Sequence, residues 1–415
     1  MTRHDEQEMV LDSVRSAHRE LHFVDSCRDQ DGPGYCYTPS SEPSLYATCY
    51  AAMLKWYIGC ERPLDGETED FILGWQDPSS GFFVGPELRA WTPPAGSKHD
   101  REHLSLHATC TVLPVLQEHG IEPRFSLHSA HDFCDQEYLA EWLDRRDMTD
   151  AWLEGNNLLF VGQLLVYLRD VEMCVQAQSA LDLYFEWLDT HVDPATGLWG
   201  TDGYCSPFVA MCGGYHQLLV YYYENHPVLY RENLVDTVLA LQHRDGGFSP
   251  AGGGGACEDA DAVDILVNMY KQVDYRQAEV RHALRRCARH LRRLQNPDGG
   301  FPYGKNAPFS HMGVPATGSS RGASNLFATW FRVHTLALIA EVLPEEVGAK
   351  GGAFRFNSAL SMGWHREWDA SQHRSSPGLS LAEVATGYRS RLGVEMRYVR
   401  QVMSGVCAKL RTSWR

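Results

Sequence analysis

The feature that most constrains the fold is a short glycine-containing turn that recurs along the chain and is followed by a long apolar segment. Residues 245–248 read DGGF, and residues 298–301 repeat the same four letters. Glycine tolerates the backbone conformations of such tight turns, and the aromatic residue behind it can plug a core. Looser versions of the turn place further plugs at Tyr35, Phe82, Trp152 and Leu198. The interval is about fifty residues in most cases, which is the size of a helix pair.

Each turn lies between two kinds of apolar pattern. The segments after the turns are apolar nearly all round, which is typical of buried helices; they begin at Ser44, Ser105, Asn156, Gly214, Glu258 and Ser324. The segments before the turns are more amphipathic; they cover about residues 8–25, 65–75, 130–145, 171–189, 231–243 and 276–294. Six buried helices alternating with six amphipathic ones predict an all-α protein, an α/α toroid of six helix pairs in an inner and an outer ring.

The toroid accounts for residues 1–345. For residues 346–415 we expect an irregular segment and then a C-terminal helical extension packed on the toroid. The stretch 309–322 is rich in glycine and serine and lies between the last turn and the last inner helix, so we expect a lid over the mouth of the toroid.

Charge and composition narrow the range of partners. The net charge of −16 argues against nucleic acid, because binding phosphates needs a basic face. The N-terminus lacks the apolar stretch of a signal peptide, and no apolar run is long enough for a transmembrane segment. The twelve cysteines show no paired CxxC spacing, and many, such as Cys49, Cys110 and Cys174, sit in apolar runs, so we expect reduced core thiols. Together these features predict a cytoplasmic protein.

An acid-rich helix start follows the turn at residues 245–248. It carries Glu258, Asp259, Asp261 and Asp264, more acids than capping of a helix N-terminus needs. Three of them follow i, i+3 spacing and share one face, so their repulsion should raise at least one pKa and leave a carboxylic acid that keeps its proton. Two interpretations of these acids remain open: a functional acid cluster, or a capped and solvated helix end.

Three inner helices open with the same small motif, so the repeats can be compared with one another. The motif reads LYATC at residues 45–49, LHATC at 106–110 and LFATW at 326–330. On this frame Tyr215 takes the aromatic position, while His216 and Asp261 take the alanine position of adjacent repeats. An ionisable group would then replace a methyl group on two neighbouring inner helices. The alternative for His216 is a buried, hydrogen-bonded core histidine.

With these turns and this acid cluster, residues 30–340 resemble the superfamily of terpenoid cyclases and protein prenyltransferase β-subunits. In class II terpene cyclases an Asp-x-Asp-Asp motif protonates an alkene or epoxide, and residues 259–262 match its first two acids. The resemblance implies that Asp261 is the general acid, with Asp259, Glu258 and Asp264 around it, and that the substrate is a small apolar isoprenoid. Residues of the inner helices would bind that substrate, namely Tyr46, Tyr50, His107, Tyr215, His216, Phe327 and Trp330.

The zinc-dependent prenyltransferase branch gives an alternative. By that resemblance Cys257, Asp259 and His216 would hold zinc, but Ala47 stands where that branch has its histidine ligand. We therefore expect no cofactor and no metal requirement for folding, with zinc or magnesium as the candidates if one is bound. This branch also implies a role as the partner subunit of a second helical chain.

A third alternative is a carbohydrate-active hydrolase or lyase, because α/α toroids also host such enzymes. Asp259 and Asp261 would then act on a sugar stacked against Trp199 or Trp330.

Overall fold

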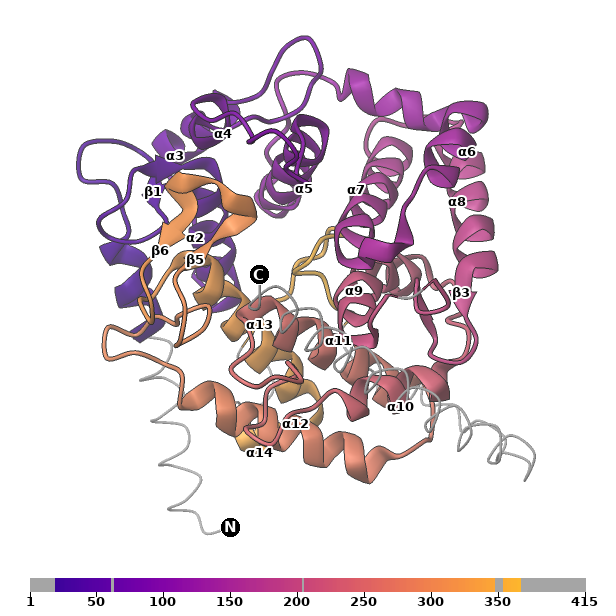
Figure 1. Ribbon diagram of the computed structural model, residues 1–415. Helices are drawn as coiled ribbons and strands as arrows, with labels where there is room; N and C mark the ends of the chain where they lie inside the picture. The colour runs from indigo at the N-terminus through magenta and orange to yellow at the C-terminus, as the bar shows by residue number, and fades with distance from the viewer. Residues whose placement is uncertain (1–18, 61–62, 204, 348–353, 367–415) are drawn as a thin grey trace, which may run out of the picture.

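The computed structural model describes residues 19–60, 63–203, 205–347 and 354–366, and its helices form two concentric rings (Figure 1). Each helix of the inner ring contacts the next one, and α13 returns to α2, so the ring is closed. The inner helices are α2 (Leu45–Tyr57), α5 (Arg101–Glu118), α7 (Ala151–Asp170), α9 (Pro207–Glu224), α11 (Ala256–Gln272) and α13 (Leu326–Val342). The predicted all-α toroid is confirmed.

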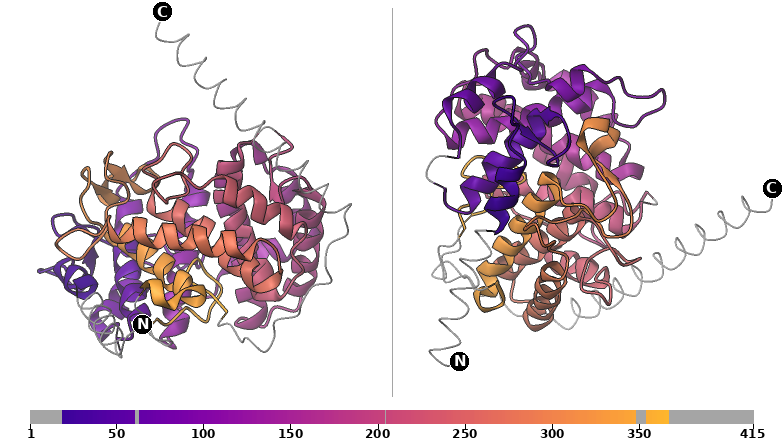
Figure 2. Two further views of the ribbon diagram at one scale, coloured as in Figure 1. Left: turned by 90° about the horizontal axis from the view of Figure 1, so that it is seen from below. Right: turned by 90° about the vertical axis from the view of Figure 1, so that its left-hand side faces the viewer.

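Shorter or more amphipathic helices surround this ring (Figure 1), and Figure 2 shows the molecule in two views turned by 90°. Residues 19–26 are helical, and the other outer helices are α3 (Gly66–Leu73), α6 (Gln136–Asp144), α8 (Ala177–His191), α10 (Arg231–Ala240) and α12 (Gln277–Arg292). The short helices are α4 (Pro86–Arg89), α14 (Pro344–Val347) and the 3-10 turns η1 (His128–Cys134), η2 (Met148–Asp150), η3 (His311–Gly313) and η4 (Pro315–Thr317). Among the described helices, none combines the length and the apolar content that a transmembrane span requires.

Three two-residue antiparallel pairings complete the described part of the chain. They join β1 (Tyr35–Cys36) to β2 (Pro43–Ser44), β3 (Val192–Asp193) to β4 (Leu198–Trp199), and β5 (Phe309–Ser310) to β6 (Gly318–Ser319). The last pair lies in the stretch that the sequence marks as a lid, and its hairpin brings η3 to the centre of the toroid.

Polar caps make three inner helices begin four to seven residues before their predicted starts. The side chains of Asp100, Asp150 and Ser206 accept hydrogen bonds from backbone N–H groups in the first turns of α5, α7 and α9. The prediction followed the apolar faces, and these caps lie outside them. One consequence concerns Trp152, which was predicted to plug a turn. It lies instead in the first turn of α7.

Hydrogen bonds between turns and inner helices define the structural alignment of the repeats. The backbone N–H of Tyr35 donates to Thr48 Oγ1 at 3.0 Å, and Phe83 and Phe301 donate in the same way to the corresponding threonines at 2.9 and 3.0 Å. In the fifth repeat the N–H of Phe248 donates to Asp259 Oδ1 at 2.7 Å. Asp259 therefore takes the threonine position.

This frame corrects two sequence-based assignments. The alanine position of the fifth repeat belongs to Glu258, so the alignment that gave it to Asp261 is wrong by three residues, because the prediction had no bond to anchor the frame. The buried plug of the second repeat is Phe83, whereas the predicted Phe82 is only partly buried.

Residues 354–366 close one end of the toroid. The N–H of Arg355 donates to the carbonyl of Tyr57 at 2.9 Å, and Tyr215 Oη donates to the carbonyl of Met362 at 2.9 Å. Glu118 accepts from the backbone N–H of Ala359 at 3.0 Å. The segment thus bridges α2, α5 and α9, and Figure 1 shows it crossing between the inner helices. The predicted C-terminal helix lies outside the described residues.

Candidate functional site

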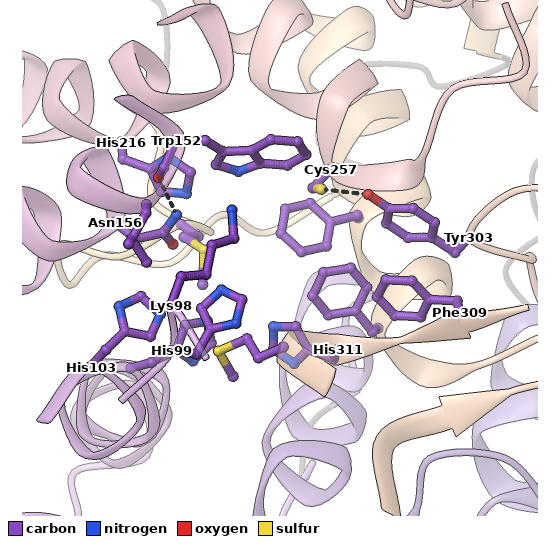
Figure 3. A pocket seen from close by; sticks show the side chains of 16 residues that line it. Lys98, His99, His103, Trp152, Asn156, His216, Cys257, Tyr303, Phe309 and His311 are labelled. Atoms are coloured by element: carbon purple, nitrogen blue, oxygen red, sulfur yellow. Dashed lines mark hydrogen bonds between the residues drawn. The ribbon is translucent and has the colours of Figure 1, made fainter. Parts of the chain in front are cut away.

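A cavity of about 210 Å³ opens at the centre of the inner ring (Figure 3). Its walls come from five of the six inner helices, from the loops before α5 and after α12, and from the β5–β6 hairpin. The lining residues are Lys98, His99, His103, His107, Trp152, Leu153, Asn156, His216, Cys257, Tyr303, Phe309, His311, Met312, Phe327, Phe331 and Met362.

Five histidines line this cavity. His99, His103 and His107 are spaced four residues apart at the start of α5, with ring centroids 5.0 and 6.2 Å apart along the series. His311 enters from η3, with its ring centroid 4.9 Å from that of His107, and His216 comes from α9. Helical spacing of four places His103 and His107 on one face of α5, and His99 joins them from the loop before the helix.

Burial keeps these imidazoles neutral. Removal from water lowers the pKa of His216 to about 4 and that of His311 to about 3. Burial, with neighbouring histidines and Lys98 adding to it, lowers the pKa of His99 to about 4. The pKa values of His103 and His107 are also lowered, mainly by burial. A cluster of imidazoles in a low dielectric avoids charge, so each ring keeps one nitrogen as a free acceptor.

Two of these rings are held in a defined tautomer. His103 Nδ1–H donates to Asn157 Oδ1 at 2.8 Å, while the amide of Asn157 donates to Glu154 at 3.0 Å. Glu154 in turn accepts from Arg146 at 3.0 Å. His216 Nδ1–H donates to the carbonyl of Cys212 at 2.7 Å. Because Nδ1 carries the proton in both rings, Nε2 is the basic atom of each.

Aromatic rings form the side opposite His103 and His216. Tyr303 and Phe309 stack with centroids 3.9 Å apart, and Phe327 and Phe331 of α13 lie beside them. Tyr303 Oη is 3.3 Å from Cys257 Sγ. Burial raises the pKa of both groups well above their ordinary values, so they are a neutral phenol and a neutral thiol. Figure 3 shows this aromatic side across the cavity from His103 and His216.

The mouth of the cavity carries a cation and an indole. Lys98 Nζ pairs with Asp150 Oδ2 at 2.9 Å, and the Lys98 side chain is 56% exposed. Trp152 lies nearby in the first turn of α7. At the other end lies Met362, from the segment that closes the toroid.

Asp259 and Glu258 have structural partners. Asp259 forms an ion pair with Arg332, and the side chains of both residues are fully buried. Arg332 also donates to the carbonyls of Gly254 and Tyr303 at 3.2 and 3.0 Å. Glu258 accepts a hydrogen bond from the backbone N–H of Gly255, which is the capping arrangement that the sequence left open.

Asp261 and Asp264 are fully buried in α11. Burial raises the pKa of Asp264 to about 7 and that of Asp261 well above its ordinary value, with the neighbouring Glu258 carboxylate adding to the Asp261 shift. Asp264 accepts from Asn268 at 3.0 Å. Among the described residues that line the cavity, none is an aspartate or glutamate. The acid cluster thus lies behind the lining residues, with Glu258 beside the lining Tyr303.

Three of the predicted substrate-binding residues line the cavity, namely His107, His216 and Phe327. Tyr46 and Tyr50 lie behind His311, with ring centroids 5.3 and 6.4 Å from it. Trp330 stacks on His334 in the core.

The remaining candidates lie away from the cavity or have other partners. Tyr215 binds the closing segment. Trp199 is buried and donates from its indole to the carbonyl of Leu188. Of the candidate zinc ligands, Cys257 and His216 line the cavity, whereas Asp259 is engaged by Arg332.

Sequence reasoning missed most of the cavity, although two signals for it were present. The spacing of four between His103 and His107 marks one helix face, and the predicted lid supplies Phe309 and His311.

Comparisons with known proteins add little to this description. No protein-family model matches the chain, and no curated protein matches it. A solved structure described as a polysaccharide lyase is similar over 81% of this chain and 98% of that chain, with 14% sequence identity and a TM-score of 0.46. The function has to be argued from the chemistry of the cavity.

Proposed function

We propose that the chain is a carbohydrate-active lyase that cleaves an acidic polysaccharide by β-elimination in this cavity. The observation that carries the proposal is a wall of neutral imidazoles facing a neutral phenol, without an aspartate or glutamate among the described lining residues. Such a wall supplies proton acceptors and donors and does not repel an anion. A uronate, a sugar that carries a carboxylate, fits this chemistry.

The elimination needs a base and a proton donor. A base removes the proton from the carbon next to the carboxylate, the freed electron pair forms a carbon–carbon double bond, and the bond to the glycosidic oxygen breaks as that oxygen takes a proton. His103 Nε2 is the proposed base, because the Asn157–Glu154–Arg146 chain holds its other nitrogen protonated. Tyr303 Oη, on the facing wall, is the proposed proton donor.

The substrate carboxylate itself activates the base. Burial lowers the pKa of His103 and makes it a weak base, but a bound anion raises the pKa of a neighbouring imidazole toward neutrality. The Lys98 ammonium at the mouth can hold the carboxylate. Trp152, Phe309 and Phe327 offer faces on which a sugar ring can stack.

The same observation argues against hydrolysis. Most glycoside hydrolases use two carboxyl groups that flank the scissile bond. Asp259 and Asp261 were the predicted pair, but Asp259 is bound to Arg332 and Asp261 is enclosed in the protein.

A second candidate is the isoprenoid cyclase that the sequence resembles. Two observations favour it: the aromatic wall and the protonated carboxyl that its raised pKa gives Asp261. The cyclase needs that acid at the substrate, yet Asp261 is outside the lining. The lyase uses residues that already line the cavity and needs no movement of Asp261, so we place it first.

A substrate screen tests the proposal. Purified protein is incubated with polysaccharides rich in uronic acid, with neutral polysaccharides and with linear isoprenoids. β-Elimination produces an unsaturated uronate that absorbs in the ultraviolet, so we expect new absorbance with at least one acidic polysaccharide and none with the same polymer after its carboxylates are reduced to alcohols. Cyclised isoprenoid products without any unsaturated sugar would reject the lyase in favour of the second candidate.

A further inference from the structure

Outside the lining of the cavity, one group of side chains has the composition of a metal site. His131 and Cys134 lie in η1, and Cys174 lies in the connection between α7 and α8. One potential ligand atom from each of the three lies within 4.8 Å of the other two. Cys174 was expected in an apolar helical run, but it lies after the end of α7.

The distances within this group suit a tetrahedral ion. The two Sγ atoms are 3.6 Å apart, and two thiolates bound to Zn²⁺ at about 2.3 Å with tetrahedral angles would be about 3.8 Å apart. Glu172 Oε2 lies 2.9 Å from His131 Nε2 and fits the role of a carboxylate that accepts a ring N–H of a metal-bound histidine. Two sulfurs and one imidazole nitrogen are zinc ligands, and they leave the fourth position of a tetrahedral ion to water.

The backbone presents the three ligands from two short segments. His131 and Cys134 are separated by two residues in η1, and Cys174 directly follows Met173. Met173 has φ of 56°, a left-handed conformation that is uncommon for a residue with a side chain. Strained backbone of this kind persists where the surrounding structure requires it.

We propose that His131, Cys134 and Cys174 bind one Zn²⁺ ion, with Glu172 orienting the imidazole, at a site separate from the cavity. The ion would tie η1 to the α7–α8 connection at the outer ring. Glu172 already contacts the segment before η1 through Ser126 Oγ and the N–H of Leu127, at 2.6 and 2.9 Å. His131 is partly exposed, so the ion can reach the site from solvent.

Metal analysis of the full chain tests the proposal. Protein purified with a reductant and without chelators, then supplied with zinc, should retain about one ion per chain after dialysis. Cobalt in place of zinc should give a thiolate-to-cobalt charge-transfer absorption. Cys134→Ser and Cys174→Ser should abolish that absorption. His131→Ala, at a partly exposed position, should fold and weaken zinc binding by at least ~10-fold.

Two control variants locate the ion. Cys60→Ser and Cys257→Ser should keep both the zinc and the cobalt absorption. Cys257 is a useful control because its thiol lines the cavity and is not part of the proposed zinc site. The proposal is overturned if the zinc-supplied wild type holds no metal, if His131→Ala and the two serine variants hold it as tightly as the wild type, or if a disulfide joins Cys134 to Cys174 in the reduced preparation. The cobalt spectrum of the wild type decides the matter even if a variant does not fold.

Discussion

At the residue scale, burial acts on the carboxyls and the imidazoles in opposite directions. It raises the pKa of Asp264 to about 7 and lowers that of His216 to about 4, and both groups are therefore uncharged around pH 6. The sequence predicted the raised acid from the spacing of the cluster, whereas the depressed histidines depend on five side chains that converge from separate elements.

Asp264→Asn should stabilise the protein more at high pH than at low pH. The unfolded carboxyl ionises near its usual value of 3.8 and the folded one near 7, so stability falls as pH rises between these values, by about 4 kcal/mol in all. Asparagine does not ionise and can still accept from Asn268. In urea unfolding, the free energy of unfolding of the variant relative to that of the wild type should be roughly 2 kcal/mol larger at pH 8 than at pH 5.5. An equal advantage at both pH values contradicts the buried-acid account, and the exposed Asp144→Asn is the control.

His103→Gln should lower the elimination rate at least ~10²-fold, because glutamine keeps a polar side chain but cannot take the proton. Asp261→Asn should leave the rate near that of the wild type, since the enclosed carboxyl does not contact the cavity. Both variants are assayed on the polysaccharide that gives ultraviolet absorbance, with melting temperatures measured beside the rates. If Asp261→Asn lowered the rate and His103→Gln did not, the acid cluster and not the histidine would carry the reaction.

Binding of an acidic oligosaccharide should take up protons near pH 6. The cavity imidazoles are neutral when it is empty, and a carboxylate placed among them raises their pKa. Calorimetric titration in two buffers of different ionisation enthalpy measures the uptake. Identical heats in the two buffers would show that no imidazole gains a proton, while a neutral oligosaccharide is the control.

At the scale of elements, the fifth repeat differs from its neighbours by an ion pair. Asp259 stands where other repeats have Thr48, Thr109 and Thr329, and Arg332 from the next inner helix neutralises it. The sequence predicted the helices and the turns because apolar pattern and glycine mark them. It could not supply the alignment of the repeats, since the bond from Phe248 to Asp259 has no sequence signature and helix caps shift each start.

A double-mutant cycle tests whether Asp259 and Arg332 replace the threonine of the other repeats as a coupled pair. Asp259→Thr restores the residue of the other repeats but leaves the Arg332 guanidinium buried without its partner, and Arg332→Met leaves the carboxylate unpaired. Each single variant should lose about 3–5 kcal/mol of unfolding free energy. The double variant should regain a large part of that loss, because no buried charge is left. Additive losses in chemical unfolding would show that the two residues act independently.

At the scale of the whole molecule, the apolar pattern of the inner helices predicted the closed ring, but not what fills its centre. The cavity combines the start of α5, the first turn of α7 and the β5–β6 hairpin, and the loops between them have no periodic pattern. Closure by residues 354–366 was likewise unpredictable, because its bonds to Tyr57, Glu118 and Tyr215 join positions far apart in the sequence.

The number of buried imidazoles makes the fold sensitive to acid. Eight described histidines have a lowered pKa, against four carboxyls with a raised one. An unfolded histidine gains a proton below about pH 6.5 while a buried one does not, so stability is complete above that value and falls toward pH 4. At pH 5.5 the cost is roughly 1.4 kcal/mol for each fully buried ring.

Scanning calorimetry should therefore show a lower melting temperature at pH 5.5 than at pH 7.5. The fall should be steeper in Asp264→Asn, which removes one opposing group. A melting temperature that stays constant or rises on acidification would mean that the histidines are solvated.

The most direct test of the account is the origin of the oxygen atoms in the product. The polysaccharide that serves as substrate is digested in heavy-oxygen water, and the masses of the fragments are measured by mass spectrometry. Elimination adds no water, so the account predicts fragments without label at the cleaved bond, each cut leaving one unsaturated uronate at the new non-reducing end. Fragments that each carry one heavy oxygen at the cleaved bond, and no unsaturation, would contradict it, because hydrolysis would then have broken the chain.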